Sequence, residues 1–474
     1  MTRMTSDDPH LKWRATTAPS LGTTGTATDR TDGAPPSGAG GEALRVLIVA
    51  DHASLRFGGE AALPYHYFRV LRRRGVEAWM VAHARCREEL EAAFPEDRDR
   101  FAFVSDTWLH RPLWFCVGRS PAKIGYLTFG MAMRLLTQFQ QRQRVRQLVS
   151  QQQIHIVHQP MPVSPKEPSL LHNVGAPVVI GPMNGGMTFP HAFAPQFQGW
   201  WTRTLLALGR FLSDPVHRFI PGKRRAELLL VANARTAAAL PGCMRGRVVE
   251  LVENGVDLER WRPEAAEAHD TMAAPSERPV RFTWVGRMVD WKAVDLLLEA
   301  FARVAPEVSC ELELIGDGPE RAALEARADA LGLKRGSQLS FAGWQPQEVC
   351  ARHLACADVM VLPSLLECGG AVVLEAMAMS RPVIATAWGG PVDYLDPECG
   401  ILVEPTSREA LIDGLAEAML ALARAPERRA AMGAAGRRRV VELFDWERKV
   451  DRVLELYQQV LEPEHAGAGP RGRG

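Results

Sequence analysis

The sequence predicts an α/β protein made of two doubly wound domains, each built around a parallel sheet. Short apolar runs alternate with helical stretches, as expected for parallel strands joined by crossover helices. With 474 residues, the chain is far longer than the roughly 100–200 residues of a typical domain. The alternation stops over residues 262–279 and then begins again, which divides the chain into two such units.

The first domain is predicted over residues 43–260, after a tail at residues 1–42 whose Thr, Gly, Ala and Pro content predicts disorder. It opens with an apolar strand at residues 45–50, followed by a glycine loop and an amphipathic helix from Glu60 to Arg74. The remaining strands of this domain are predicted at residues 76–82, 101–105, 154–158, 177–181, 228–232 and 248–252.

The second domain is predicted over residues 280–442, after a polar linker or exposed loop at residues 261–279. The chain from Ser407 to Leu461 is nearly all helical, with a C-terminal helix assigned to residues 443–464 and a disordered tail to residues 465–474. The strands of this domain are predicted at residues 281–285, 311–315, 338–342, 358–362, 382–385 and 400–403.

Composition excludes several classes of protein. Apolar residues make up 46% and charged residues 23%, which excludes wholesale disorder, collagen and coiled coils. The net charge of +1 argues against a nucleic acid partner. We find no apolar run long enough for a transmembrane helix and no signal-peptide core near the N-terminus. Eight cysteines without a CxxC pair indicate reduced thiols in the cytoplasm and no zinc site.

The loop after the first strand contains Gly58 and Gly59 directly before a helix. Glycines there let backbone N–H groups approach a ligand, and the helix dipole favours an anion such as phosphate. A tight strand–helix turn that needs glycine for packing explains the pair equally well. The loop has no GxGxxG motif, so NAD binding is not indicated.

Two cations follow the first strand of the second domain, at the strand end where open α/β sheets bind ligands. Arg287 and Lys292 together suit a diphosphate, although both could also be solvated surface residues. After the next strand, Gly316 and Gly318 could let a nucleobase pass at close range, or form a plain turn before Pro319.

The segment from Pro363 to Ala378 contains more candidate binding residues than any other segment of this length. Glu367 lies in the loop, Gly369 and Gly370 open the next helix, and Glu375 lies about one turn inside it. The helix N-terminus suits phosphate, and the two carboxylates suit sugar and ribose hydroxyls. The alternative is a surface acid and an ordinary helix residue, but an acid among apolar neighbours, like Glu375, needs a partner.

These residues resemble a known family. Glu367 and Glu375, with seven residues between them, form the E-x7-E signature of retaining glycosyltransferases of family 4, which have the GT-B fold. The resemblance extends from Arg45 to Tyr457 and is more specific in the second half. It also rests on residues 375–385, 285–287 with Lys292, 253–257, 58–59 and 389–391.

The resemblance implies two Rossmann-like domains facing a central cleft, with the C-terminal helix crossing back to the first domain. The second domain would bind a nucleoside-diphosphate sugar, and the first a glycan or lipid-linked acceptor. Arg287 and Lys292 would hold the diphosphate, and Glu375 the ribose. Glu367 and the amides of Gly369–Ala371 would hold the transferred sugar. No metal or other cofactor would be needed, because the cations and the helix dipole would stabilise the leaving diphosphate.

One segment departs from the family pattern. Many members have a histidine in the loop after the strand at residues 177–181, where this chain has Asn184 between glycines. Asn184 can donate hydrogen bonds to a substrate but cannot titrate. His158, at the end of the preceding strand, could reach the site instead, or be a satisfied histidine at a strand end.

The first domain is locally basic. Between Thr107 and Ser213 the sequence holds ten Lys or Arg residues, several aromatic residues and a single acid, Glu167. Residues 198–212 read as an amphipathic helix that would lie in the headgroup layer of an anionic membrane, at the inner face of the plasma membrane. Alternatively, the aromatic residues pack in the core and the cations face a soluble anionic acceptor.

The sequence therefore predicts a cytoplasmic, peripherally membrane-bound, retaining and metal-independent hexosyltransferase of polysaccharide or glycolipid biosynthesis. A catalytically silent nucleotide-sugar-binding partner protein is the alternative, favoured by the missing loop histidine. An epimerase is disfavoured by the E-x7-E pair, and a phosphorylase by the lack of a pyridoxal phosphate lysine motif.

Overall fold

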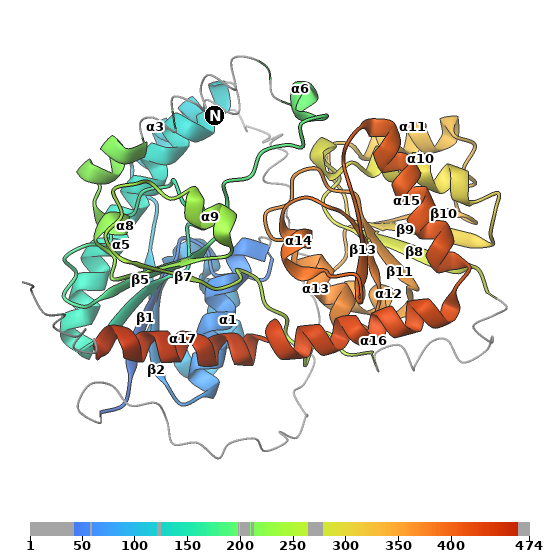
Figure 1. Cartoon of the computed structure of the whole chain (residues 1–474). Helices are drawn as coiled ribbons and strands as arrows, with labels where there is room; N and C mark the ends of the chain where they lie inside the picture. The colour runs from blue at the N-terminus through green and yellow to red at the C-terminus, as the bar shows by residue number, and fades with distance from the viewer. Residues whose placement is uncertain are drawn as a thin grey trace, which may run out of the picture. The chain divides into compact units, whose positions relative to one another are not determined.

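The structure, a computed structural model, describes residues 42–56, 59–120, 125–197, 199, 209, 213–263 and 278–462. Within these ranges it contains two parallel sheets, one of seven strands and one of six, with helices on both faces of each (Figure 1). The prediction of two doubly wound α/β domains is confirmed. The predicted tails, Gly58, and most of residues 198–212 and 261–279 lie outside the described residues.

The first sheet has the strand order β3-β2-β1-β4-β5-β6-β7. The central strand β1 is covered on one face by the helix α1 and on the other by α5. A strand that is buried on both faces consists of consecutive apolar residues, so it can be predicted from the sequence. The strands are β1 (Arg45–Val49), β2 (Glu77–His83), β3 (Phe101–Val104), β4 (Ile156–Gln159), β5 (Val178–Met183), β6 (Leu228–Val231) and β7 (Arg247–Glu250).

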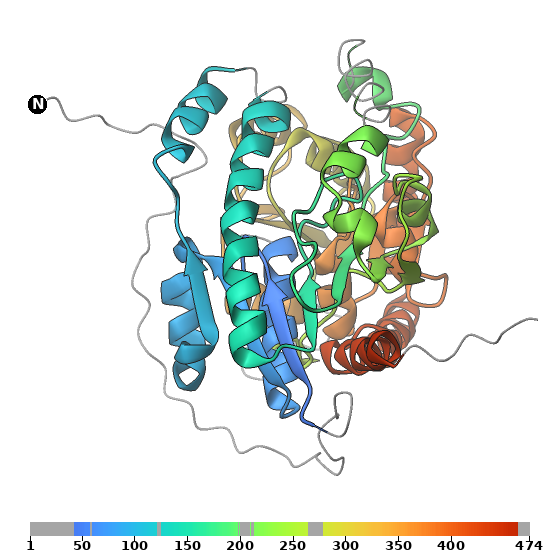
Figure 2. The ribbon, with the colours of Figure 1, turned by 90° about the vertical axis from the view of Figure 1, so that its left-hand side faces the viewer.

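The crossovers of the first domain differ in length. Two long helices, α1 (Gly59–Arg73) and α5 (Met131–Gln152), carry most of the packing against the sheet. Figure 2 shows α5 from its outer side, with α3 beside the end at which α5 begins. The shorter elements are η1 (Ala84–Cys86), α2 (Arg87–Ala93), η2 (Pro95–Arg100), α3 (His110–Arg119), η3 (Tyr126–Gly130), α6 (Ala194–Phe197), α8 (Gly222–Arg225) and α9 (Ala234–Ala238).

The second sheet has the strand order β10-β9-β8-β11-β12-β13. Its strands are β8 (Val280–Val285), β9 (Cys310–Ile315), β10 (Leu339–Gly343), β11 (Val359–Leu362), β12 (Val383–Thr386) and β13 (Gly400–Val403). Its helices are η5 (Asp290–Lys292), α10 (Val294–Val304), α11 (Arg321–Ala330), α12 (Gln347–Cys356), α13 (Ala371–Ala378), α14 (Gly390–Tyr394), α15 (Arg408–Ala423) and α16 (Pro426–Leu443).

All thirteen predicted strands occur in the described residues, with bounds that differ from the prediction by at most two residues. The largest extension is in β5, which continues from Gly181 to Met183. The ladder with β6 shifts register after Ile180 and resumes where Met183 pairs with Val231. The prediction stops at the Gly–Pro pair because these residues normally end a strand.

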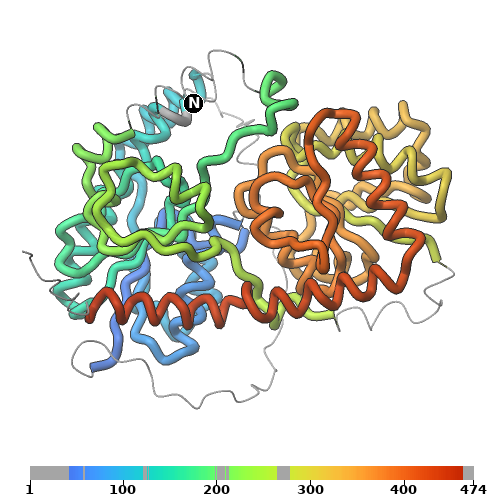
Figure 3. The backbone as a smooth tube through the Cα atoms, in the orientation of Figure 1, coloured from blue at the N-terminus to red at the C-terminus, as the bar shows by residue number. Residues whose placement is uncertain are grey.

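The last helix, α17 (Trp446–Leu461), returns to the first domain. Val450, Val453 and Tyr457 are fully buried in a cluster with Tyr67 and Phe68 of α1. Figure 3 follows the chain from α16, which packs on α13, into α17 beside the first sheet. The predicted return of the C-terminal helix is thus part of the fold. None of the helices in the described ranges is long and apolar enough to span a bilayer.

His158 belongs to this packing and does not line a substrate site. Its side chain is fully buried, and its Nε2 donates to the Gly181 carbonyl at 2.6 Å. Its Nδ1 accepts from the hydroxyl of Tyr457, also at 2.6 Å. Burial lowers the pKa of His158 to about 4, so the ring is neutral. The hypothesis that His158 reaches the site is therefore wrong, because both ring nitrogens already have protein partners.

We predict that Tyr457→Phe destabilises the fold by about 1–3 kcal/mol, because the change leaves the buried Nδ1 of His158 without a donor. Chemical unfolding followed by circular dichroism measures this difference. Tyr65→Phe is the matched control, since the hydroxyl of Tyr65 has no hydrogen bond among the described residues. Equal stability of the two variants would show that the Tyr457 hydroxyl does not support His158.

Candidate functional site

The strand order of the second sheet reverses between β8 and β11, and such a reversal marks where open α/β sheets bind ligands. The loop after β8 carries Arg287 and Lys292, and the loop after β11 carries Glu367 and leads into α13. The two loops are joined by a hydrogen bond of 2.8 Å from the N–H of Leu365 to the carbonyl of Trp291. The topology thus brings the predicted residues of both loops together.

Lys292 and Glu367 form an ion pair. Their side chains are only 16% and 13% exposed, so water screens the pair weakly. The pair joins a residue predicted to hold diphosphate to one predicted to hold a sugar. A ligand with both phosphate and hydroxyl groups would therefore meet both charges at one place.

Arg287 is the second residue after β8, at the carboxyl edge of the sheet, and its side chain is exposed. Among the described residues its guanidinium has no hydrogen bond or ion pair. A guanidinium offers five donors in a rigid fork, which matches phosphate oxygens. Arg287 can therefore take an anion without first breaking a contact within the protein.

Glu375, in α13, is an acidic residue that, like Arg287, has no hydrogen-bond partner among the described residues. Its side chain is half-buried, and no hydrogen bond or ion pair reaches its carboxylate from the described part of the chain. Burial raises its pKa to about 7, partly opposed by the positive charge of Arg260. The sequence predicted that an acid at this place needs a partner, and the described protein residues supply no hydrogen bond.

Glycines let the loop that carries Glu367 pack closely against its neighbours. Gly370 precedes α13 with a φ of +77°, and an added Cβ would lie 2.9 Å from Cγ of Glu367. Gly390, which opens α14, donates its N–H to the carbonyl of Glu367 at 2.8 Å. A Cβ there would lie 2.0 Å from the carbonyl of Gly369. The loop is therefore held by backbone contacts on both sides.

Gly316 and Gly318 lie close to the loop after β8, as the predicted alternative of a tight turn requires. Gly316 has a φ of +135°, and a Cβ on it would lie 1.8 Å from the carbonyl oxygen of Gly286. A Cβ on Gly318 would lie 2.2 Å from the carbonyl of Met288. The close approach that requires glycine is thus to the chain's own loop after β8, and the contact of Gly316 with a nucleobase stays a prediction.

Asn184 connects the first domain to the loop of the site. Its Nδ2 donates to Oε2 of Glu253 at 2.7 Å and to the carbonyl of Cys368 at 2.8 Å. The side chain is buried, and these bonds use both of its N–H donors. Asn184 is therefore occupied by protein groups and positions the loop, rather than donating to a substrate as predicted.

Glu253 and Lys449 complete this connection. Glu253 is fully buried, and burial together with the nearby charge of Glu60 raises its pKa to about 7. Lys449, from α17, is also buried, and its ammonium donates to the carbonyls of Val252 and Glu253. Glu253 is thus held in place by two segments: Lys449 of α17 binds its backbone, and Asn184 of the loop after β5 binds its side chain.

In the sequence, Glu253 stood out only as part of a motif, and nothing marked Lys449 as part of the site. Lys449 lies in an amphipathic helix, where a lysine is normally solvated. A signal for Glu253 was present, because it directly follows the strand predicted at residues 248–252. Its burial depends on Asn184, which lies 69 residues away in the chain.

The first domain contributes the loop between β1 and α1, at the reversal of its own strand order between β1 and β4. Ser54 and Leu55 in this loop donate to the carboxylate of Glu89. A Cβ added to Gly59 would lie 4.0 Å from Cβ of Ala371, the first residue of α13. Gly59, which belongs to the domain predicted to bind the acceptor, is therefore adjacent to the N-terminus of α13 in the second domain.

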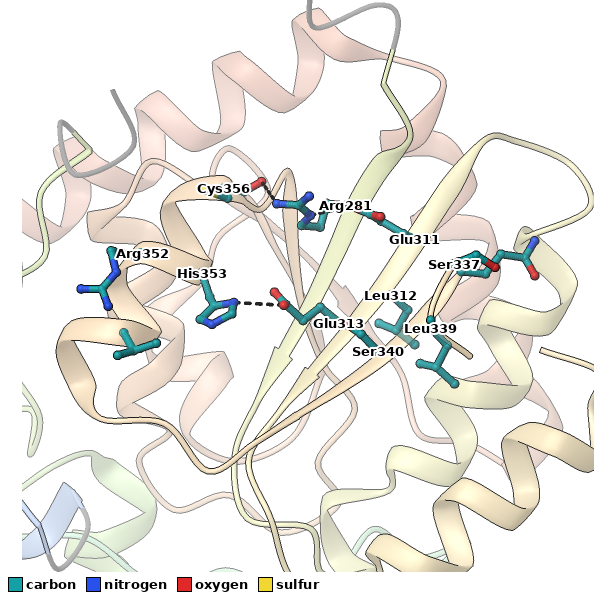
Figure 4. Close-up of a pocket in the computed structure, with 13 residues that line it drawn as sticks. Arg281, Glu311, Leu312, Glu313, Ser337, Leu339, Ser340, Arg352, His353 and Cys356 are labelled. Atoms are coloured by element: carbon teal, nitrogen blue, oxygen red, sulfur yellow. Dashed lines mark hydrogen bonds and ion pairs between the residues drawn. The ribbon is translucent and has the colours of Figure 1, made fainter. Parts of the chain in front are cut away.

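A separate cavity of about 380 Å³ lies at the opposite ends of the strands of the second sheet (Figure 4). It is lined by the first residues of β8, β9 and β10 and by α12. Glu313 accepts from Nδ1 of His353 at 3.0 Å across this cavity, and Arg281 pairs with Glu311. None of the predicted site residues lines it, and Arg281, Glu311, Glu313 and His353 are already paired in these two contacts.

No group of three His, Cys, Asp or Glu residues that could hold a metal ion occurs among the described residues. The polar groups that gather at the carboxyl edge of the second sheet are instead Arg287, Lys292, Glu367 and Glu375. Two of these are paired with each other, and the other two have no hydrogen-bond partner in the described chain.

Comparison with known proteins agrees with this geometry. Residues 279–422 match the sequence profile of a family described as glycosyl transferases group 1. The matched part contains the whole second sheet and all four polar residues of the site. The second domain therefore resembles that family in sequence.

Two relatives illustrate the similarity. A D-inositol 3-phosphate glycosyltransferase of Rhodococcus opacus is 33% identical over 48% of this chain and 52% of its own length. An alpha-maltose-1-phosphate synthase of Mycolicibacterium smegmatis is 32% identical over 45% of this chain and 57% of its own length. In these matches the chain spans little more than half the length of the curated relatives.

Solved structures show the fold of nearly the whole chain. A glycosyltransferase from Rickettsia africae matches with a TM-score of 0.60 and 14% identity, over 89% of this chain and 100% of its own. Sucrose-phosphate synthase from Thermosynechococcus elongatus matches with a TM-score of 0.58 and 20% identity, with the same coverage. The predicted fold, GT-B with two Rossmann-like domains, is confirmed.

We predict that the carboxyl of Glu375 makes the protein less stable as the pH rises. Its pKa is raised from 4.5 to about 7 by burial, so the folded state holds a proton that the unfolded state has lost. Its stabilising contribution is full below pH 4.5 and is lost as the pH rises through about 7. Glu375→Gln should therefore lose less stability than the parent protein between pH 5 and pH 8, by on the order of 1 kcal/mol.

Chemical unfolding at the two pH values measures this difference. Glu398→Gln is the control, because Glu398 is an exposed carboxylate of the same domain. Its stability should follow the parent protein at both pH values. Parallel pH profiles for Glu375→Gln and the parent protein would contradict the assignment.

Proposed function

We propose that this protein is a retaining glycosyltransferase that moves a hexose from a nucleoside-diphosphate sugar to an acceptor hydroxyl. The observation that carries the proposal is the Lys292–Glu367 ion pair at the strand-order reversal, next to Arg287 and Glu375, which have no hydrogen-bond partner among the described residues. The sequence match to glycosyl transferases group 1 over this domain supports it. The Anabaena protein HepE, solved with UDP and glucose, shares the fold with a TM-score of 0.58 at 15% identity, over 87% of this chain and 99% of its own.

The diphosphate would be held by Arg287, Lys292 and the N-terminus of α13. Arg287 is open to solvent and can bind phosphate oxygens with two donors. Lys292 would shift part of its interaction from Glu367 to the phosphate. The first amides of α13 add the positive end of the helix dipole. Together these groups would stabilise the negative charge that develops as the diphosphate leaves.

The two carboxylates would bind hydroxyl groups. Glu375 lacks a hydrogen-bond partner among the described residues, so ribose hydroxyls would supply the donors that it lacks. Glu367 would accept from a hydroxyl of the transferred sugar while its other oxygen stays near Lys292. Gly369, Gly370 and Ala371 leave room for the sugar beside the loop, because none of them carries a long side chain.

Transfer with retention fits a site without a protein nucleophile. The bond from the anomeric carbon to the diphosphate oxygen breaks, and the bond to the acceptor oxygen forms on the same face. The acceptor's proton passes to the leaving diphosphate, so no protein base and no metal ion is required. The buried state of His158 and the occupied amide of Asn184 are consistent with this route.

The acceptor would bind to the first domain, near Gly59, which faces the start of α13. We propose a glycan or lipid-linked acceptor and a place in polysaccharide or glycolipid biosynthesis in the cytoplasm. The alternative, a silent nucleotide-sugar-binding partner protein, gains nothing from the structure. Its best support was a missing histidine, and a diphosphate that takes the proton makes that residue unnecessary.

We predict that Arg287→Ala lowers turnover by on the order of a hundredfold, the usual effect of losing one preorganised donor. Arg287→Lys should restore only part of the activity, because lysine lacks the fork geometry. The measurement is the release of nucleoside diphosphate from the donor, with and without acceptor. Arg352→Ala, which removes an exposed arginine at the other end of the same sheet, is the control and should keep full activity. A folded Arg287→Ala protein with unchanged turnover would contradict the assignment.

We predict that the two carboxylates divide the donor between them. Glu375→Gln should weaken binding of the free nucleoside diphosphate and of the nucleotide sugar by similar factors. Glu367→Gln should weaken the nucleotide sugar much more than the free diphosphate. Calorimetric titration of both ligands into both variants measures the four affinities. Equal losses in all four would rule out separate ribose and sugar contacts.

A further inference from the structure

The turn before α3 and the first turns of α3 expose large apolar side chains, an arrangement that the proposed reaction does not explain. Trp108 is 77% exposed, Trp114 50% and Phe115 58%, and Leu109 is exposed beside them. We call these four residues the α3 face. Single exposed apolar residues are common, but three exposed aromatic rings within residues 108–115 mark an interaction surface.

The inner side of α3 is fixed to the domain, so the α3 face points outward. His110 is buried, and its Nε2 lies 3.1 Å from the hydroxyl of Thr137 in α5. Leu113 and Val117, three and seven residues further along, are partly buried on the same side. This i, i+3, i+7 spacing defines the packed side of a helix, and Trp114 and Phe115 lie off it.

The charges around the α3 face are positive. Arg111 and Arg119 are exposed on the same helix, and the Arg119 guanidinium lies 3.6 Å from the ring centre of Phe115. Residues 107–120 contain no acid. The preceding acid, Asp106, is 55% exposed, and its carboxylate lies 3.2 Å from Nε2 of His83 and 3.8 Å from Nε2 of His110.

The next acid along the chain is Glu167, which is buried and paired with Arg134 at 2.6 Å. Asp106 is therefore the one exposed acid of residues 106–167, against Arg111 and Arg119 on α3.

The location of the α3 face suits contact with an extended surface. Figures 1 and 2 both show α3 at the end of the first domain away from α17, beside the start of α5. The helix begins a few residues after the carboxyl end of β3. It therefore lies at the same edge of the first sheet as the loop that contains Gly59.

We propose that the α3 face docks on an anionic lipid bilayer, with its tryptophan rings in the headgroup layer and its arginines on lipid phosphates. Tryptophan favours this layer because its ring is apolar and its N–H is polar. Arginines near the surface add attraction to anionic lipids. A protein partner would have to present acidic and apolar groups in a matching pattern, whereas an anionic bilayer offers both everywhere. The proposal stands independently of the glycosyl transfer reaction.

Sedimentation with vesicles tests the proposal on the full chain. The protein should sediment with phosphatidylcholine vesicles that contain phosphatidylglycerol, and much less with phosphatidylcholine alone. Binding should fade at about 1 M salt, where the Debye length is about 3 Å. Replacing Trp108, Trp114 and Phe115 together with serine should reduce binding at least tenfold. Arg111→Gln with Arg119→Gln should also reduce it at least tenfold, since each arginine contributes about fivefold.

Two controls separate docking from general surface effects. Trp344→Ser removes a tryptophan of the second domain that is 52% exposed, close to the value of Trp114, and should leave binding unchanged. Trp108→Phe with Trp114→Phe should keep most of the binding. In that variant, quenching of tryptophan fluorescence by brominated acyl chains should fall, because the inserted rings are gone.

Three results would overturn the proposal. The first is no binding to anionic vesicles at low salt, and the second is binding that the triple serine variant leaves unchanged. The third is self-association of the chain, removed by the serine variant, without any vesicle binding, which would make a second copy the occupant. Donor turnover measured without vesicles tests the proposed reaction alone, so the membrane proposal can fail while the proposed reaction stands.

Discussion

The arrangement of the site depends on the hydrogen bond between Asn184 and the buried carboxylate of Glu253. Asn184 also donates to the carbonyl of Cys368, the residue after Glu367. The backbone at Glu253 is in turn held by Lys449 of α17. The loop of the second domain that carries the site is thus connected to the core of the first domain through side chains that water does not reach.

This connection explains an apparent excess of ionisable groups in the interior. Burial raises the pKa of Glu253 to about 7 and lowers the pKa of Lys449 to about 7, since each charge loses its hydration. Their opposite charges attract, which partly offsets that loss. Buried polar groups of this kind cost stability unless every partner is in place, so they favour one relative position of the segments that they join.

The strands of both domains could be predicted from the sequence for a physical reason, and so could the position of the loops that carry the candidate site. Parallel strands buried on both faces are uninterrupted apolar runs, and the loops at their carboxyl ends carry the polar residues of a site. Lys292 and Glu367 could be placed together from this rule alone. The spacing of Glu367 and Glu375 added a family resemblance, which the match over residues 279–422 supports.

The errors share a different cause. His158 and Asn184 were each interpreted from their place at a strand end, but their partners come from distant parts of the chain. Tyr457, which satisfies His158, lies 299 residues away. Local pattern shows that a polar residue lies at an edge, yet it cannot show whether another segment already occupies its hydrogen bonds.

Thermal unfolding with a panel of nucleotide sugars tests the central claim most directly. We expect at least one nucleoside-diphosphate sugar to raise the free energy of unfolding by about 2.7 kcal/mol when it is present at 100 times its dissociation constant. The same ligand should give a much smaller shift with Arg287→Ala. A folded protein that no uridine, guanosine or adenosine diphosphate sugar stabilises would contradict the claim that these loops bind a nucleotide-sugar donor.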